Sequence, residues 1–129
     1  MDNNELIKMA HKAKEFAYSP YSNFKVGAAL LTTNGKVFLG CNIENGSYGA
    51  TNCAERTAIF KAISEGYTNF EKIAIVSSSG DFTMPCGICL QVMSEFMLDK
   101  DIVLSNDNGD IKVLKVRDFL PHNFSFKKE

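Results

Sequence analysis

Three cysteines and a glutamate stand at positions from which they could share one metal ion. Cys53 begins the segment "CAERTAIF", where Glu55 follows two residues later, and Cys86 and Cys89 lie three apart in "PCGIC". Each segment opens a stretch with the pattern of a helix, which predicts thiols at two helix N-termini. Three thiolates and one open position are typical of a catalytic zinc, because structural zinc sites use four protein ligands. The spacing therefore predicts a zinc centre suited to hydrolysis.

The residues after Cys53 add to this prediction. Glu55 is close enough to a metal ligand to exchange protons with a bound water, as general acid–base catalysis requires. Arg56 can donate a hydrogen bond to a thiolate and offset its charge from the second coordination sphere. The alternatives are a glutamate that only favours the helix dipole and an arginine that only meets solvent.

The pair Cys86 and Cys89 is ambiguous alone, since a CxxC also suits a redox dithiol or half of a structural zinc site. Cys41 is the remaining candidate for a fourth ligand. In "FLGCNIE" it alternates with Leu39 and Ile43, and if that apolar set faces the core, Cys41 is a buried thiol without a chemical role. The opposite strand face then carries Gly40, Asn42 and Glu44.

The elements that position these motifs alternate between helices and strands. An amphipathic first helix is predicted within 3–18, with Asn3 or Asn4 as its cap, followed by an antiparallel hairpin of strands 24–33 and 36–44 around Asn34-Gly35. Helices over about 53–65, ended by Gly66, and about 86–98 alternate with strands 71–79 and 101–105, and an antiparallel edge strand spans 111–116. The strands at 71–79 and 101–105 are predicted to be parallel because a helix connects them. We therefore expect one domain over 1–129, a three-layer α/β/α fold with a mixed sheet of about five strands.

Composition narrows the class of protein. The net charge is −1 with scattered Lys and Arg, which argues against a nucleic-acid partner and leaves small neutral molecules open. No run approaches the roughly 20 apolar residues of a membrane span. The first residues lack the features of a secretory signal, so we expect a cytoplasmic protein with reduced thiols and no membrane partner.

The motifs resemble those of the zinc-dependent cytidine deaminases, specifically the small homotetrameric kind that acts on free nucleosides. The likeness runs through "YSPYSNFKVGAAL", "NIENGSYG", "CAERTAIF", "PCGIC", Gln91 and "FLPHNF". The resemblance implies the cytidine-deaminase-like fold, one Zn²⁺ per subunit on the three cysteines, and Glu55 as the acid and base. One departure is Leu90, where the family commonly has an arginine, which leaves Arg56 to offset the charge of the thiolates.

The resemblance also implies which residues bind the substrate. Asn42 and Glu44 would hydrogen-bond the ribose hydroxyls, in agreement with their shared strand face. Phe24 would pack against the pyrimidine, and the backbone around Ala54 would contact the base edge. Positions that reach into the site of a neighbouring subunit match Gly46, Tyr48 and Phe124, with Phe124 stacking on the base.

The expected reaction is hydrolytic deamination of free cytidine and 2′-deoxycytidine to uridine and 2′-deoxyuridine plus ammonia, a step of pyrimidine salvage. One alternative is deamination of a related cytosine nucleoside such as blasticidin S, or of bases in nucleic acid. Another is a structural zinc module without activity. Asn42 and Glu44 favour a free ribose, and Glu55 beside an open metal position disfavours the structural module.

Overall fold

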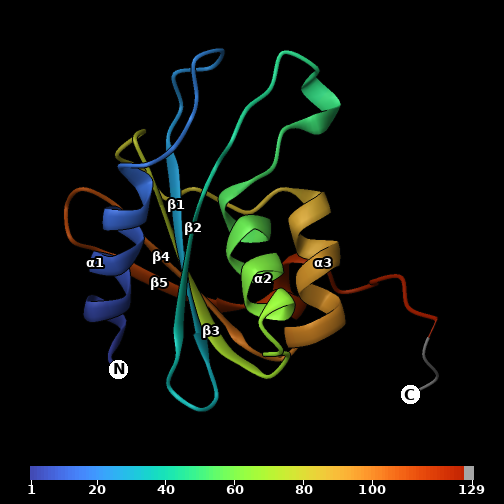
Figure 1. The fold of residues 1–129 in the computed structure, drawn as a ribbon. Helices are drawn as coiled ribbons and strands as arrows, with labels where there is room; N and C mark the ends of the chain where they lie inside the picture. The colour runs from blue at the N-terminus through green and yellow to red at the C-terminus, as the bar shows by residue number, and fades with distance from the viewer. Residues whose placement is uncertain (127–129) are drawn as a thin grey trace.

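A five-stranded mixed sheet forms the middle layer of the computed structural model, which describes residues 1–126 (Figure 1). Its strand order is β2-β1-β3-β4-β5, and the strands are β1 (Val26–Thr32), β2 (Val37–Cys41), β3 (Phe70–Ser77), β4 (Asp101–Ser105) and β5 (Ile111–Lys115). β1 pairs antiparallel with β2 and β3, β3 pairs parallel with β4, and β4 pairs antiparallel with β5. The predicted hairpin, parallel pair and edge strand are confirmed.

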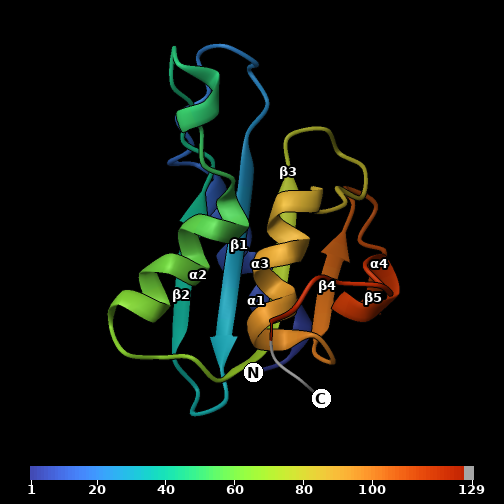
Figure 2. The ribbon, with the colours of Figure 1, turned by 90° about the vertical axis from the view of Figure 1, so that its right-hand side faces the viewer.

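Helices cover both faces of the sheet. α1 (Asn3–Lys14) lies on one face, and α2 (Ala54–Ser64) and α3 (Gly87–Met97) lie side by side on the other (Figures 1 and 2). A short 3-10 helix, η1 (Tyr48–Ala50), and a single-turn helix, α4 (Val116–Phe119), were not predicted. The three-layer α/β/α fold is confirmed. None of the helices within residues 1–126 combines the length and apolar character that a membrane span requires.

The interior strand β1 is buried along its whole length and separates two hydrophobic cores. Ala28 and Leu30 face the core under α2 and α3, whereas Ala29 and Leu31 face the smaller core under α1. Since successive side chains of a strand point to opposite faces, a strand covered on both sides becomes a continuous apolar run. This explains why "VGAALL" does not alternate with polar residues.

Two glycines let helices pack directly on the sheet backbone. A Cβ at Gly27 would lie 2.0 Å from the Ala10 carbonyl oxygen of α1, and one at Gly40 would lie 2.4 Å from the Ala54 carbonyl oxygen of α2. Either methyl group would push its helix away from the sheet. Gly40 matters most for the site, because it fixes the first turn of α2 against β2.

This close packing corrects the predicted face of β2. The sequence grouped Cys41 correctly with Leu39 and Ile43, but the buried face is the opposite one, with Gly40 under α2 and Asn42 8% exposed. Cys41 is half-buried and Ile43 is largely exposed. The prediction was wrong because it placed the face with the more apolar side chains against α2. The helix packs on the opposite face, because Gly40 has no side chain to keep it away.

Two predicted turn details also changed. Asp2 caps α1, and its Oδ1 accepts a hydrogen bond from Glu5 N at 2.8 Å, so neither Asn3 nor Asn4 is the cap. In the hairpin, only Gly35 has a positive φ, at 89°. The predicted stop of α2 is confirmed, because Gly66 takes φ 93° just after the helix ends.

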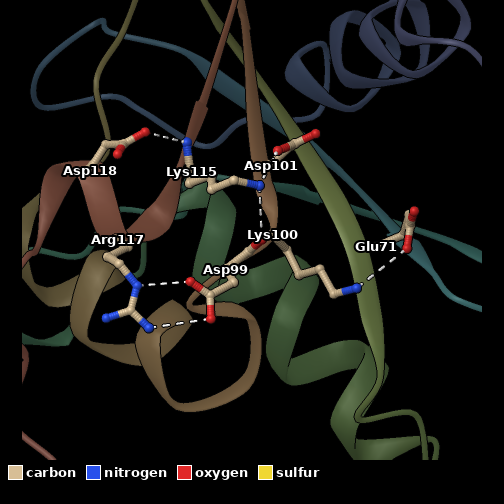
Figure 3. A network of polar contacts seen from close by, with 7 residues as sticks. All are labelled: Glu71, Asp99, Lys100, Asp101, Lys115, Arg117 and Asp118. Carbon is tan, nitrogen blue, oxygen red and sulfur yellow. Dashed lines mark hydrogen bonds and ion pairs between the residues drawn. The ribbon is translucent and has the colours of Figure 1, made fainter.

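A network of charged side chains lies at the end of the domain where α3 leads into β4 (Figure 3). Arg117 of α4 donates from Nε and Nη2 to the two carboxylate oxygens of Asp99, at 2.8 and 3.2 Å. Lys115 Nζ donates to the Asp99 carbonyl at 3.2 Å and pairs with Asp101 at 3.7 Å. The network therefore attaches α4, and the start of the C-terminal segment, to the end of α3.

Candidate metal centre

The N-termini of α2 and α3 lie at the same end of the sheet (Figure 2). Cys53 is the N-cap of α2, Cys86 is the N-cap of α3, and Cys89 lies in the first turn of α3. The free backbone N–H groups of a helix start favour negative charge, and Cys89 N donates to Cys86 Sγ at 3.4 Å. The fold thus gathers three thiols at two helix N-termini.

The spacing of the three sulfurs suits a zinc ion. All three Sγ atoms lie within 4.8 Å of one another, and those of Cys53 and Cys86 are 3.8 Å apart. Two thiolates on a tetrahedral zinc, at bonds of about 2.3 Å, would be about 3.8 Å apart. Within residues 1–126 no other group of metal-binding side chains gathers in this way, and Cys41 is not part of this one. Three protein ligands leave one position for water or substrate.

Arg56 contacts the sulfurs, as predicted. Its Nη2 donates to Cys53 Sγ at 3.3 Å. The pKa of the Cys53 thiol is lowered, chiefly by the hydrogen bond from the Cys89 thiol and further by Arg56 and Cys86, although burial opposes this. Leu90, which directly follows Cys89, is 7% exposed and packs in the core under α2 and α3.

Glu55 lies in the first turn of α2 and is 4% exposed. Burial raises the pKa of its carboxyl group to about 7, because the charged form loses its hydration. Its side chain lines a cavity of about 190 Å³ together with Cys53 and Cys86. A carboxyl group that can exist in both protonation states near neutral pH therefore lies beside the metal-binding thiols.

Most of the predicted base-binding residues line the same cavity. Its lining consists of Phe24, Val26, Asn42, Thr51, Cys53, Ala54, Glu55, Thr83, Met84 and Cys86. Sequence reasoning missed Val26, Thr51, Thr83 and Met84. The last two directly precede "PCGIC", so their position in the loop that enters α3 was the available signal.

A second cavity, of about 370 Å³, contains Glu44 and Tyr48 and shares Thr51 with the first. Its lining consists of Tyr21, Ser22, Glu44, Asn45, Tyr48 and Thr51. Gly46 lies near its rim, because a Cβ there would be 3.1 Å from the Tyr21 hydroxyl. Asn42 and Glu44 therefore line adjoining cavities that share Thr51.

Asn42 also has a structural role that the sequence did not suggest. Its side-chain amide donates to the Phe24 carbonyl at 2.7 Å and accepts from Val26 N at 2.9 Å. The buried amide thus fixes the backbone on both sides of the turn into β1. Each of its polar atoms retains capacity for one further hydrogen bond.

Phe124, unlike the other predicted substrate-binding residues, neither lines one of the two cavities nor lies at the rim of one. Its carbonyl accepts from Gln91 Nε2 at 3.0 Å, and its ring meets Phe126 edge-on with centroids 5.0 Å apart. The segment that carries it runs across the outer side of α3 (Figures 1 and 2). Phe124 is 62% exposed.

Comparison with known proteins identifies the family of this centre. The model described as the cytidine and deoxycytidylate deaminase zinc-binding region matches residues 1–105. The chain belongs to this family. The thiols of Cys53, Cys86 and Cys89 bind its zinc.

Relatives in this deaminase family span nearly the whole chain. A cytidine deaminase of Halalkalibacterium halodurans is 52% identical over 126 residues, which cover 97% of this chain and 96% of the relative. A probable cytidine deaminase of Dictyostelium discoideum is 51% identical over 94% of this chain and 73% of its own length. The crystal structure of cytidine deaminase from Burkholderia pseudomallei has a TM-score of 0.92 and 51% identity, and covers 96% of this chain and 100% of that one. The predicted fold and family are confirmed.

Proposed function

We propose that the chain hydrolyses free cytidine and 2′-deoxycytidine to uridine and 2′-deoxyuridine, releasing ammonia, as a step of pyrimidine salvage. The observation that carries the proposal is the buried Glu55 carboxyl group, which shares a cavity with the zinc-binding thiols. All of 1–129 would act as one deaminase domain, of which residues 127–129 lie outside the described residues.

In this proposal Glu55 is the proton carrier. When bound, zinc supplies Lewis-acid chemistry that makes water nucleophilic near neutral pH. Glu55 accepts the proton that the attacking water loses and delivers a proton to N3 of the cytosine ring while the new C4–O bond forms. It then accepts the remaining proton of the new C4 hydroxyl group and delivers it to the departing amino group as the C4–N bond breaks and the C4 carbonyl forms. One water is consumed, ammonia leaves, and Glu55 returns to its starting state.

The neighbouring residues would hold the nucleoside for this transfer. Phe24 offers a ring for packing against the pyrimidine, and the backbone around Ala54 lies beside Glu55 in the same cavity. The Asn42 amide would donate and accept hydrogen bonds with the ribose hydroxyls, and the Glu44 carboxylate would accept them. Arg56 would offset the negative charge of three thiolates, which otherwise makes zinc a poor Lewis acid.

We further propose a homotetramer in which subunits complete one another's sites. Exposed aromatic rings support this arrangement, since Tyr48 is 78% and Phe124 is 62% exposed. Phe124 would stack on the base in a neighbouring site, with Gly46 and Tyr48 at the contact. Sedimentation of the wild-type protein tests the tetramer. For Phe124→Ala, sedimentation should show that the tetramer persists, and steady-state kinetics should show a raised KM for cytidine.

The cytoplasm remains the proposed compartment, because zinc-binding thiols must stay reduced and deprotonated. Blasticidin S and bases in nucleic acid are the alternative substrates. A panel of cytidine, 2′-deoxycytidine, cytosine, blasticidin S and a short single strand, followed by ultraviolet absorbance with zinc-loaded protein, decides among them. We expect turnover of the first two compounds. Undetectable turnover of the whole panel by zinc-loaded protein would favour a structural zinc module.

A further inference from the structure

Ser22 connects two of the residues that the proposed function assigns to the nucleoside. It lies in the turn that leads into β1 and lines the 370 Å³ cavity beside Glu44. Its Oγ accepts a hydrogen bond from Phe24 N at 3.0 Å and donates to Glu44 Oε2. Because a hydroxyl has one proton and the Phe24 N–H already occupies an acceptor site, the proton of Ser22 is directed to the carboxylate.

Glu44 is held from one side by three donors of this turn. Its Oε1 accepts from Tyr21 N at 3.0 Å and Ser22 N at 3.1 Å, and its Oε2 accepts from the Ser22 hydroxyl. A carboxylate has about four acceptor positions, so about one remains, on Oε2. The Ser22 hydroxyl is the donor to that same oxygen and therefore decides where its remaining lone pair points.

The backbone around this carboxylate is fixed as well. Glu44 N donates to the Tyr18 carbonyl at 2.8 Å, and Tyr18 N donates to the Asn42 carbonyl at 3.0 Å. The turn and the chain after β2 are thus joined like neighbouring strands. With the backbone of Glu44 held and its Oε1 bound by two backbone N–H groups, the Ser22 hydroxyl fixes the orientation of Oε2.

We propose that Ser22 is a positioning residue that orients Glu44, so that one lone pair of Oε2 is ready to accept a hydrogen bond from a sugar hydroxyl of the substrate. This role rests on the proposed function. The hydrogen bond from Ser22 also lowers the pKa of Glu44, which keeps the carboxylate ionised as an acceptor. Ser22 itself does not contact the reacting atoms of the base.

Steady-state kinetics of Ser22→Ala with two substrates tests this role. We expect KM for cytidine to rise about tenfold, as for loss of a hydrogen bond to a charged group, with kcat within about twofold of wild type. KM for 2′,3′-dideoxycytidine should change less than about twofold, because that substrate lacks the hydroxyls that Glu44 would bind. Ser22→Thr, which keeps the hydroxyl, should restore KM for cytidine.

Two further variants control for general damage. Ser64→Ala removes a serine hydroxyl that donates to the Lys61 carbonyl at 2.8 Å, at the opposite end of α2 from the thiols, and should leave both KM values unchanged. In a Glu44→Gln background, Ser22→Ala should add little to KM, because the two residues act as one unit. Zinc content and melting temperature should match wild type in every serine variant.

The role is overturned if Ser22→Ala leaves KM for cytidine unchanged, raises KM equally for both substrates, or acts additively with Glu44→Gln. It is also overturned if Ser22→Thr is as impaired as Ser22→Ala. These outcomes require a wild-type protein that deaminates cytidine. A wild type without that activity contradicts the proposed function first, and the role of Ser22 with it.

Discussion

Two arginines, Arg56 of α2 and Arg117 of α4, lie near opposite ends of α3, and each contacts an acidic partner. Their surroundings differ. Arg56 donates to the Cys53 sulfur beside Glu55, which is 4% exposed, whereas Arg117 holds Asp99 with side chains that are 49% and 68% exposed. The second pair has the better bidentate geometry (Figure 3). Nevertheless, water already stabilises both of its charges, and exposed pairs contribute little to stability. We expect the position beside the zinc-binding thiols, rather than the number of hydrogen bonds, to decide which of the two contacts affects activity.

The largest effect expected at the metal end comes from Glu55→Gln. The amide has nearly the same shape but cannot accept and release the proton, so kcat for cytidine should fall by about a hundredfold to ten-thousandfold. Zinc content should stay at the wild-type level, because Glu55 is not among the three ligands. Ultraviolet absorbance and metal analysis of the same sample measure both.

Glu65→Gln is the matched control. Glu65 is exposed and follows the other end of α2, so its loss should leave kcat unchanged. Comparable rates for Glu55→Gln and wild type would show that Glu55 does not carry the proton. Loss of zinc in Glu55→Gln would instead assign it to the metal.

Removal of the metal should have the next largest effect. Cys89→Ser replaces a fully buried thiol of the cluster and should lose zinc, with a fall in melting temperature of about 10 °C, because metal binding stabilises the folded state. A chelator acting on the wild type should lower the melting temperature similarly. Cys41→Ser is the control, since this half-buried thiol lies outside the cluster, and its zinc content should equal that of wild type. Retention of zinc by Cys89→Ser would remove it from the ligand set.

The two arginines themselves give a direct comparison. Arg56→Gln should lower zinc affinity or kcat by about tenfold, as expected for a partner that orients and neutralises metal ligands. Arg117→Gln should change neither, because its partner Asp99 lies at the far end of α3. Competition with a chromogenic chelator measures zinc affinity, and ultraviolet absorbance measures kcat. Equal effects of the two substitutions would show that the position beside the zinc-binding thiols is not the deciding difference.

The metal end was largely predictable from the sequence, because its residues occur as local motifs at helix starts. The spacings in "CAERTAIF" and "PCGIC" suggest three ligands, a carboxyl group and an arginine, and the structure brings the thiols, Glu55 and Arg56 together. Strand pairing was also predictable, since hairpin and crossover lengths restrict the possible connections.

What the sequence could not predict depends on contacts between distant segments. The buried face of β2 depends on how closely α2 approaches Gly40, and the role of Ser22 depends on a hydrogen bond to a residue 22 positions away. Similarly, the position of Phe124 depends on Gln91 and on how α4 attaches to the end of α3. Pattern and propensity describe single elements, so such pairings appear only in the folded chain.

The smallest effect is expected at the exposed end, for Asp99→Asn. The hydrogen bonds from Arg117 lower the pKa of Asp99 in the folded protein. Its contribution to stability is therefore present above the pKa of an unfolded aspartate, about 3.9, and is lost as the pH falls through the lower folded value. At pH 7 the substitution should lower the melting temperature by no more than about 4 °C, and the two proteins should melt progressively closer together as the pH falls through the folded pKa of Asp99. Thermal unfolding at several pH values measures this difference. If Asp99→Asn cost more than Arg56→Gln in stability at pH 7, exposure would not limit the value of the pair, and the contrast between the two ends would fail.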